Sequence, residues 1–372
     1  MNNLIETIPF LSFSKMNNQI REELISSFTK FVDNGWYILG NEVRDFEIAY
    51  AKHYGTKYCV GVSNGLDALS LSLMALNVGK GDEVILPSNT FIATVLAVSY
   101  VGATPVFVEP DIESYNIDPQ KIEQAITKST KVIIPVHLYG QACEMSEIMT
   151  IAQKHGIYVL EDNAQAHGAT WEQKFTGTWG HINATSFYPG KNLGALGDAG
   201  AITTDNADLA ERVKMLRNYG SREKYFHEEI GCNHRLDECQ AAFLSIKLKY
   251  IDEWTIQRQQ IAQVYFNLLK NLTDIVLPVT KKSATHVYHL YVIRTKKRDE
   301  LRTFLSENGV GTLIHYPVPP HLQKAYQGLG YKKGDFPIAE TLADTCLSLP
   351  MWPGMTNEMV EKICNYIISF YK

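Results

Sequence analysis

Residues 186–201 read SFYPGKNLGALGDAGA, and this stretch leads our interpretation of the whole chain. One lysine, Lys191, lies among four glycines and other small residues, directly after a run that predicts a strand. A lysine is usually a solvated surface charge, because burial of its ammonium group is costly and lowers its pKa. Here the small, mostly uncharged neighbours favour a desolvated lysine beside a flat ligand. Such a lysine is the nucleophile that Schiff-base chemistry on a carbonyl requires.

The sequence around this stretch alternates strand-like and helix-like segments. Runs rich in β-branched residues predict seven strands, at 58–63, 83–87, 104–109, 131–137, 158–162, 184–188 and 199–204. Between the first five, apolar residues recur at helical spacing, as Leu66, Leu69 and Leu73 do. Some strands are apolar throughout, which is typical of strands covered on both faces. The pattern predicts an α/β fold with a seven-stranded, mostly parallel sheet between helices.

The pattern changes after residue 235. Residues 235–270 form one helical stretch that is longer than a typical globular helix, so we expect it to bend or break. The remainder predicts strands at 286–295 and 311–316 and helices at 297–308, 337–346 and 357–371. The loop at 317–334 is long enough to be functional. We therefore predict a large α/β domain at 1–240, including the N-terminal segment, and a helical connector with a small α+β domain at 241–372.

Composition excludes several classes of protein. The 372 residues include 35 basic and 40 acidic ones, a net charge of −5 without any block of like charges, whereas a nucleic-acid binder needs a basic face. The longest apolar runs reach about half of the ~20 residues that cross a bilayer. The N-terminal residues lack the basic flank and cleavage site of a signal peptide. The six cysteines show no metal-ligand spacing. We expect a cytoplasmic chain with no metal site and no membrane or nucleic-acid partner.

Two further motifs offer groups for a charged ligand at strand ends. Ser63, Asn64 and Gly65 follow the first predicted strand, where free N–H groups at the start of a helix suit a phosphate. The same residue types also cap an ordinary helix, so that alternative stays open. Asp162 ends the fifth strand, at the edge where α/β proteins bind ligands, and could pair with a protonated ring nitrogen. Metal ligation or helix capping is its alternative role, although no second carboxylate at suitable spacing favours a metal.

These motifs, in this order, resemble those of the DegT/DnrJ/EryC1/StrS family of nucleotide-sugar aminotransferases, within the fold-type I pyridoxal-phosphate enzymes. The resemblance covers nearly the whole chain and rests on EDNAQAHGA at 161–169, the lysine stretch at 186–201 and GCNHRLDECQAA at 231–242. It implies a transaminase that binds pyridoxal 5'-phosphate. It also implies a homodimer in which each active site is shared between the subunits.

The resemblance implies roles for the cofactor-binding residues. Lys191 would hold the cofactor covalently and later move a proton between the substrate carbon and the cofactor. Asp162 would pair with the pyridinium nitrogen, and Gln165 would lie near the phenolic oxygen. The remaining expected contacts are Phe91 on the ring, Ser63, Asn64, Gly65 and Ser186 on the phosphate, and Asn233 on the phosphate bound by the other subunit. Asn233 suits a helix N-cap equally well.

For the sugar nucleotide the resemblance implies fewer residues. The candidates are Tyr188, Tyr219, Ser221, Lys224, His315 and Tyr316. Residues 217–225 gather donors suited to a diphosphate, with a plain polar loop as the alternative. His289 is interpreted as a core histidine of a strand.

The residues after the lysine, 192–200, are similar to those of relatives that place an amine at C3 of a keto-sugar. The resemblance therefore implies transfer from L-glutamate to C3 of a dTDP-3-oxo-6-deoxyhexose, giving a dTDP-3-amino-3,6-dideoxyhexose. A C4-specific nucleotide-sugar or keto-inositol aminotransferase would share every cofactor residue. A dehydratase of this fold would replace Lys191. A non-catalytic regulator would need an added domain, for which residues 1–44 offer no basic helix-turn-helix pattern.

Overall fold

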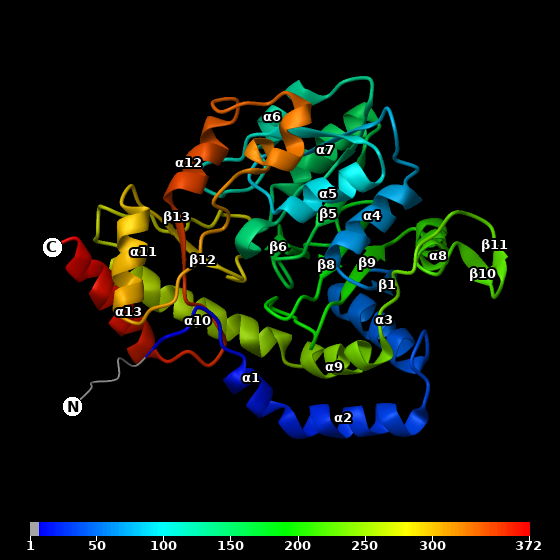
Figure 1. Ribbon diagram of the computed structural model, residues 1–372, viewed down its shortest axis with the longest axis horizontal. Coiled ribbons are helices and arrows are strands. Elements are labelled where there is room, and N and C mark those ends of the chain that lie inside the picture. The colour runs from blue at the N-terminus through cyan, green and yellow to red at the C-terminus, as the bar shows by residue number, and fades with distance from the viewer. Residues whose placement is uncertain (1–6) are drawn as a thin grey trace.

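The computed structural model describes residues 7–372, so the first six residues of the predicted large domain lie outside the described residues. Its centre is a seven-stranded sheet in the order β1-β9-β8-β5-β4-β2-β3 (Figure 1). β9 runs antiparallel to β1 and β8, and the other neighbours are parallel. The strands are β1 (Tyr58–Val62), β2 (Glu83–Pro87), β3 (Thr104–Val108), β4 (Thr130–Ile133), β5 (Tyr158–Asp162), β8 (Ile182–Ser186) and β9 (Gly200–Thr204). The prediction of seven strands in a mostly parallel sheet is confirmed.

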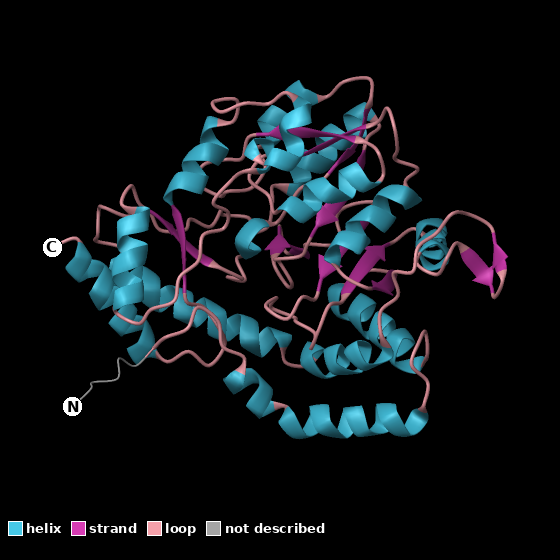
Figure 2. Cartoon of the chain, viewed as in Figure 1, coloured by secondary structure: helices cyan, strands magenta, loops and turns pink. Residues whose placement is uncertain are grey.

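Helices cover both faces of this sheet because its strands are apolar on both sides (Figure 2). Along β2, Val84 and Leu86 pack into one core with α4, α5 and α8, whereas Ile85 packs with α6 and α7 on the other face. On that second face, α3 and α9 cover β1 and β9. The helices are α3 (Asn41–Tyr54), α4 (Gly65–Ala75), α5 (Ile92–Tyr100), α6 (Pro119–Ala125), α7 (Met145–His155), α8 (Ala207–Leu216) and α9 (Glu238–Leu248).

The long helical stretch is broken, as its length predicts. α9 ends at Leu248 and α10 (Ile251–Leu269) begins after a short interruption. α10 leads to a second core, to which it contributes Tyr265 and Leu269. The other elements of that core are β12 (Tyr291–Arg294), its antiparallel partner β13 (Cys346–Leu349), α11 (Arg298–Glu307) and α13 (Asn357–Phe370). α12 (Pro337–Thr345) packs instead against the first core.

The predicted strand at 311–316 is wrong. Only Leu313 forms an isolated bridge, to Ser348, because the backbone groups just before it pair elsewhere. The carbonyl of Gly309 and the N–H of Gly311 both bond to Ile8 near the N-terminus. The strand expected at 286–295 is shorter than predicted, since Tyr288 has a φ of 45°, outside the extended region.

The N-terminal helices lie along the outside of α9 and α10 (Figure 1). They are α1 (Ser14–Gln19) and α2 (Arg21–Asn34). Met16 and Ile20 pack against Ile246 and Trp254, which joins this segment to the helical connector. We retain the division near residue 240 as a proposal, based on the change of core that follows α9. Along residues 7–372, none of the helices has the length and apolar character that crossing a membrane requires.

The short elements complete the chain. They are the strand pairs β6 (Thr170–Trp171) with β7 (Lys174–Phe175) and β10 (Ser221–Glu223) with β11 (Phe226–His227), and the 3-10 helices η1 (Leu138–Gly140), η2 (Pro320–Leu322) and η3 (Lys324–Leu329). The last two lie within the loop at 317–334.

Candidate active site

The candidate site lies where the parallel strands end. Asp162 and Ser186 are the last residues of the neighbouring strands β5 and β8. Asp162 lies two residues after Leu160, and Ser186 lies two residues after Ala184. Since Leu160 and Ala184 face the first core, Asp162 and Ser186 point to the same side of the sheet. Gly65 begins α4 close to Ser186, since a Cβ on this glycine would lie 2.6 Å from the Ser186 Cβ. Strand ends and a helix start therefore meet at one place in the fold, which we call the Lys191 crevice.

Asp162 is buried and held by two hydrogen bonds. Thr94 Oγ1 donates to its Oδ2 at 2.9 Å, and the N–H of Ala164 donates to its Oδ1 at 3.1 Å. Burial raises the pKa of this carboxyl, and the two hydrogen bonds and the charge of Lys191 offset part of that effect. No helix begins at Asp162, and the described residues contain no group of three metal-ligating side chains. Its remaining acceptor capacity suits a cationic donor such as a protonated ring nitrogen.

Lys191 occupies a tight loop between β8 and β9. Its N–H donates to the carbonyl of Tyr188 at 2.8 Å. A Cβ on Gly194 would overlap Pro189 O, so the loop closes only with glycine there. Burial lowers the pKa of the Lys191 amine to about 8, with the charge of Asp162 acting in the opposite direction. The desolvated lysine expected from the sequence is therefore present.

Another lysine, which is fully buried, supports this loop. Lys247 of α9 donates from Nζ to the carbonyl of Gly194 at 2.7 Å. Burial lowers its pKa to about 8 as well. No local motif marks Lys247, which lies within the helical stretch expected at 235–270.

Three histidines lie within the electrostatic field of Lys191: His167, His289 and His315. Burial and the lysine charge lower the pKa of His167 to about 3 and that of His315 to about 4, and they lower the pKa of His289 well below its ordinary value. All three are neutral at physiological pH. His289, which we interpreted as a core histidine, has Nδ1 3.3 Å from Asn192 Oδ1, beside the lysine. Nothing in its local sequence indicated this position.

Gln165, Tyr316 and Phe91 form one wall of the crevice. Gln165 Oε1 accepts from the N–H of Tyr139 at 2.6 Å, and its Nε2 donates to Tyr316 Oη at 3.1 Å. The ring of Tyr316 lies 5.2 Å from that of Phe91, whose side chain remains 49% exposed. Burial and the charge of Asp162 raise the pKa of Tyr316, while the bond from Gln165 opposes them. His315 is tied to Ser348 Oγ at 2.8 Å.

The start of α4 is a capped helix. Asn64 Oδ1 accepts from the N–H of Asp67 at 2.9 Å, so the capping alternative for Asn64 is confirmed. The Asp67 carboxylate also accepts from Asn64 Nδ2 at 2.7 Å and from the Ser63 hydroxyl. A phosphate-binding role for Ser63, Asn64, Gly65 and Ser186 stays a prediction.

Glu161 holds β5, the strand that ends at Asp162, from the opposite face of the sheet. Its fully buried carboxylate accepts three backbone N–H groups from the loop at 177–180, at 2.6 to 2.8 Å. His137 Nε2 lies 2.8 Å from Glu161, and His137 Nδ1 accepts from the N–H of Cys143. Nδ1 is therefore the unprotonated nitrogen, and Nε2 donates to Glu161.

Within one chain, the described contacts of residues 217–231 include none with Lys191 or Asp162. The β10–β11 hairpin projects from the body (Figure 1). Ser221 donates to the carbonyl of Asn218 at 3.0 Å, Tyr219 is half exposed, and Lys224 lies over the ring of Tyr225. Tyr188 is also exposed, at the entrance side of the lysine loop.

Two glycines close the base of this hairpin segment. Gly220 has a φ of 70°, and a Cβ there would overlap Glu229 O. A Cβ on Gly231 would overlap Gly220 N. The two backbones therefore touch directly, which leaves no room for any other residue type.

Arg217 differs from expectation, and for Asn233 the structure excludes one of two alternatives. Arg217, expected among the diphosphate donors, is buried and pairs with Glu47 at 2.6 Å, so its role is structural. Asn233 is exposed and forms a bridge with Asn218. The N-cap of α9 is Asp237, which excludes the capping alternative for Asn233.

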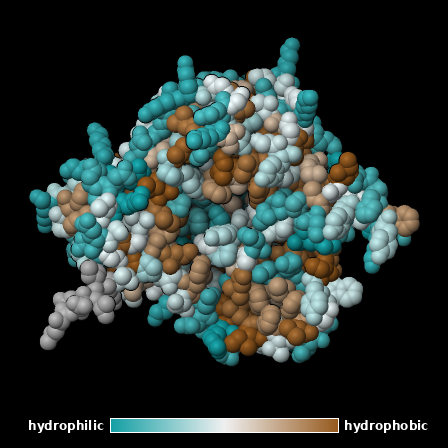
Figure 3. Space-filling model, in the orientation of Figure 1, coloured by the Kyte–Doolittle hydropathy of each residue, from teal (hydrophilic) through white to brown (hydrophobic). Residues whose placement is uncertain are grey.

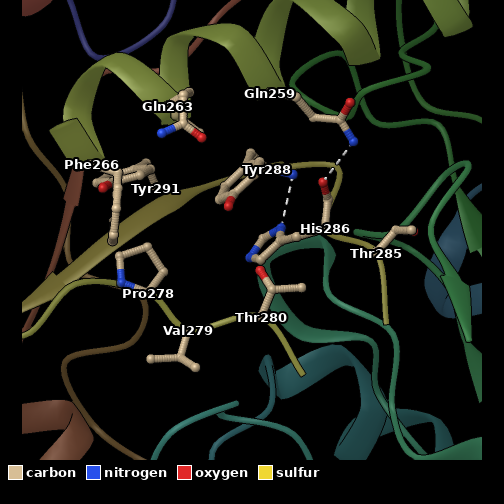
Figure 4. Close-up of a pocket in the computed structure, with 11 residues that line it drawn as sticks. Gln259, Gln263, Phe266, Pro278, Val279, Thr280, Thr285, His286, Tyr288 and Tyr291 are labelled. Carbon is tan, nitrogen blue, oxygen red and sulfur yellow. Dashed lines mark hydrogen bonds between the residues drawn. The ribbon is translucent and has the colours of Figure 1, made fainter. Parts of the chain in front are cut away.

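A separate cavity of 530 Å³ lies between α10 and residues 278–291 (Figure 4). Gln259, Phe266 and Tyr288 are among its lining residues, and Figure 4 shows the ring of His286 bonded to the Tyr288 N–H at its floor. Its lining includes no charged side chain and none of the predicted site residues. It is unsuited to a phosphate, and the chemistry lies at the Lys191 crevice.

Comparison with known proteins agrees with this geometry. The model of the DegT/DnrJ/EryC1/StrS aminotransferase family matches residues 18–368. A dTDP-3-amino-3,6-dideoxy-alpha-D-galactopyranose transaminase of Aneurinibacillus thermoaerophilus is 52% identical over 96% of this chain and 97% of its own. The crystal structure of DesV from S. venezuelae superposes with a TM-score of 0.97 at 45% identity, covering 98% of this chain and 99% of that one.

A third comparison concerns the cofactor. The crystal structure of ntda from Bacillus subtilis, with bound cofactor PMP, has a TM-score of 0.92 at 32% identity and covers 99% of this chain and 86% of that one. The fold-type I architecture predicted from the sequence is confirmed.

The lowered pKa of Lys191 predicts a pH profile for its reactivity. Covalent incorporation of added pyridoxal 5'-phosphate, trapped with borohydride and measured by peptide mass spectrometry, should accelerate through about pH 8 as the amine loses its proton. In Asp162→Asn the midpoint should move to lower pH, because the lost carboxylate charge no longer raises the pKa of Lys191. An unchanged midpoint in that variant would contradict the electrostatic link between the two groups.

The four donors around Glu161 predict a stability effect. Glu161→Gln places an amide NH₂ against N–H donors inside the protein and should lower the free energy of unfolding by ~3 kcal/mol. Urea unfolding measures it, with Glu22→Gln as the control, since the Glu22 side chain is 86% exposed. Equal effects of the two substitutions would count against the buried network.

Proposed function

The chain belongs to the DegT/DnrJ/EryC1/StrS aminotransferase family, and we propose that it transfers an amino group from L-glutamate to C3 of a dTDP-3-oxo-6-deoxyhexose. The product would be a dTDP-3-amino-3,6-dideoxyhexose. The observation that carries amino-group transfer is a largely desolvated amine, Lys191, close enough to the buried carboxylate of Asp162 for each charge to shift the pKa of the other. We further propose that the enzyme acts in the cytoplasm, where its six free thiols stay reduced.

Pyridoxal 5'-phosphate is the cofactor of this aminotransferase, and the described residues fit it. Phe91 and Tyr316 offer an aromatic wall, and the close approach of Gly65 to Ser186 forms a narrow cradle at the start of α4. Asp162 is an acceptor for the ring nitrogen. When bound, the cofactor supplies an electron sink for the carbon that loses its proton.

The chain's own residues supply binding and proton transfer. With its pKa near 8, Lys191 is partly neutral at physiological pH, so it can attack a carbonyl carbon and can also accept a proton from the substrate carbon. Thr94 and the Ala164 N–H fix the orientation of Asp162. Neutral His167, His289 and His315 add no competing cation beside the lysine. Gln165 orients the Tyr316 hydroxyl toward the crevice.

The finer assignment, dTDP and C3, rests on sequence similarity. The relative from A. thermoaerophilus is named for a dTDP-3-amino-3,6-dideoxy sugar and is 52% identical to this chain. Residues 192–200 after the lysine are of the same kind as those of C3-specific relatives. We propose L-glutamate as the donor because the resemblance to nucleotide-sugar aminotransferases implies it. Both substrates would then use one site in two successive half reactions.

We propose a homodimer whose active sites are shared. Asn233 is exposed and has no hydrogen bond within the described part of the chain, as expected of a group that serves another subunit. Near the hairpin side, α2 and the loop after it expose Phe28, Val32 and Trp36, the last at 65%. Figure 3 shows apolar side chains gathered over the lower region, where α2 and α9 lie. An apolar patch of this kind is typical of a subunit interface.

Replacement of the lysine tests the reaction itself. Lys191→Ala should lower the rate of 2-oxoglutarate release from glutamate by about 10³-fold or more, because the variant lacks the group that moves the proton. Single-turnover absorbance measurements follow this half reaction. A rate close to that of the unaltered protein would exclude the proposed role of Lys191.

A product assay tests the sugar. Incubation with dTDP-3-oxo and dTDP-4-oxo sugars side by side, followed by NMR of the products, should give an amine at C3 only. An amine at C4 alone would replace the C3 assignment with the C4-specific alternative. A colourless protein without either activity would favour the regulator.

Mixed dimers test the shared site. Asn233→Ala and Lys191→Ala subunits are each expected to be impaired alone. If Asn233 serves the other subunit, a hybrid of the two holds one intact site and should regain about half of the activity of the unaltered dimer. If Asn233 acts within its own chain, every site in the hybrid is damaged and no activity returns.

A further inference from the structure

One charged pair at the start of α4 has no place in the reaction described above. Asp67 lies in the first turn of α4, and its Oδ2 atom is 2.7 Å from His234 Nδ1. The same oxygen accepts from Asn64 Nδ2 at 2.7 Å and from the Ser63 hydroxyl. Both side chains are partly shielded from water, with 15% of Asp67 and 29% of His234 exposed. The pair is therefore less screened than a surface ion pair.

This arrangement creates a conflict at the proposed phosphate site. Ser63 and Asn64 are the side-chain donors expected for the cofactor's phosphate, and both already bond to a carboxylate. Like charges held close together in a shielded site repel each other. The charge of Asp67 also affects its surroundings. Burial is the main cause that raises the pKa of the Cys232 thiol, and the charge of Asp67 raises it further. A phosphate at this helix start needs a group that compensates Asp67.

The backbone directs His234 to that position. Its N–H donates to Arg217 O at 3.0 Å, and its carbonyl accepts from the N–H of Ser63 at 3.2 Å. Arg235 forms a bridge with Val62, so the segment runs extended beside the end of β1. Side chains alternate in an extended segment, and His234 faces Asp67 while Arg235 turns away to Asn218 Oδ1 at 3.1 Å.

We propose that His234 is a positioning residue of the phosphate site in its own chain. Its Nδ1–H bonds to the Asp67 carboxylate, so that carboxylate keeps a partner when the Ser63 hydroxyl and the Asn64 amide turn toward a phosphate. This inference rests on the proposed function, because the cradle at Gly65 must hold the cofactor's phosphate. Ser63 Oγ lies 3.4 Å from His234 Nδ1, so the three side chains form one cluster.

Two probes separate a phosphate effect from a general structural one. Pyridoxamine 5'-phosphate binds without a covalent bond to the protein, and pyridoxamine differs from it only by the absence of the phosphate. Fluorescence titration of the full-length apoprotein gives both dissociation constants. In His234→Phe, which removes the donor and keeps a ring, the phosphorylated probe should bind about tenfold more weakly. Binding of pyridoxamine should change by less than about twofold, since it makes no contact with this cluster.

Three further variants complete the experiment. His234→Gln keeps a neutral donor and should lie between the unaltered protein and His234→Phe. Asp67→Asn combined with His234→Phe removes the unbalanced charge and should recover most of the lost affinity. His53→Phe is the matched control: it removes a histidine of α3 that is 24% exposed and lies 3.6 Å from Asp252 of α10, far from the start of α4 in the sequence, and it should leave both constants unchanged. If His234→Phe does not fold, His234→Gln and its combination with Asp67→Asn carry the same comparison.

The outcomes separate this inference from the proposed function. Equal loss of both probes in His234→Phe, or unchanged binding of the phosphorylated probe, overturns the role of His234 and leaves the transaminase assignment standing. An unaltered protein that binds pyridoxamine 5'-phosphate no better than pyridoxamine overturns the phosphate site and, with it, both proposals. Selective loss of the phosphorylated probe, with recovery in the double variant, supports the inference.

Discussion

The site depends on holding an amine and a carboxylate close together where both are largely removed from water. Burial alone would neutralise both groups, because it lowers the pKa of Lys191 and raises that of Asp162. Each charge offsets part of the shift of the other. Thr94 and the Ala164 N–H add stabilisation to the carboxylate, while neutral histidines around the lysine avoid further repulsion. The result is an amine that changes its protonation state close to physiological pH, which a group used both to attack a carbonyl and to carry a proton requires.

The last two residues of β5 have different roles, one structural and one in ligand binding. Glu161 and Asp162 are consecutive, so their side chains face opposite sides of β5. Glu161 meets three backbone N–H groups and His137, and its bonding capacity is used for structure. Asp162 keeps capacity for a ligand. The hydrogen bonds of Glu161 thus fix the backbone position of Asp162, although Glu161 itself takes no part in ligand binding.

Local patterns predicted most of the sheet and the centre of the site. The seven strands follow from β-branched runs, and Lys191 and Asp162 stand out because each ends or follows a strand of one sheet. Gln165 and Phe91 are expected from the family resemblance. Contacts between distant segments could not be read in this way. The Asp67–His234 pair joins residues whose local sequences suggest only helix capping, and Arg217 resembled a ligand donor until its partner Glu47 was known. The strand expected at 311–316 is absent because Ile8, at the other end of the chain, occupies the backbone groups nearby.

The two glycines at the base of the β10–β11 hairpin make that segment a module. Gly220 and Gly231 bring two backbones into direct contact, so the chain enters and leaves the hairpin through one fixed point. Changes in the sequence or length of the segment between them need not disturb β8, β9 or the lysine loop. Residues from Ser221 to Ile230 can therefore vary with little effect on the cofactor-binding core, except Glu229, which pairs with Arg212 of α8 at 2.8 Å. Recombination at these two glycines offers protein engineers natural junctions for exchanging the segment between relatives.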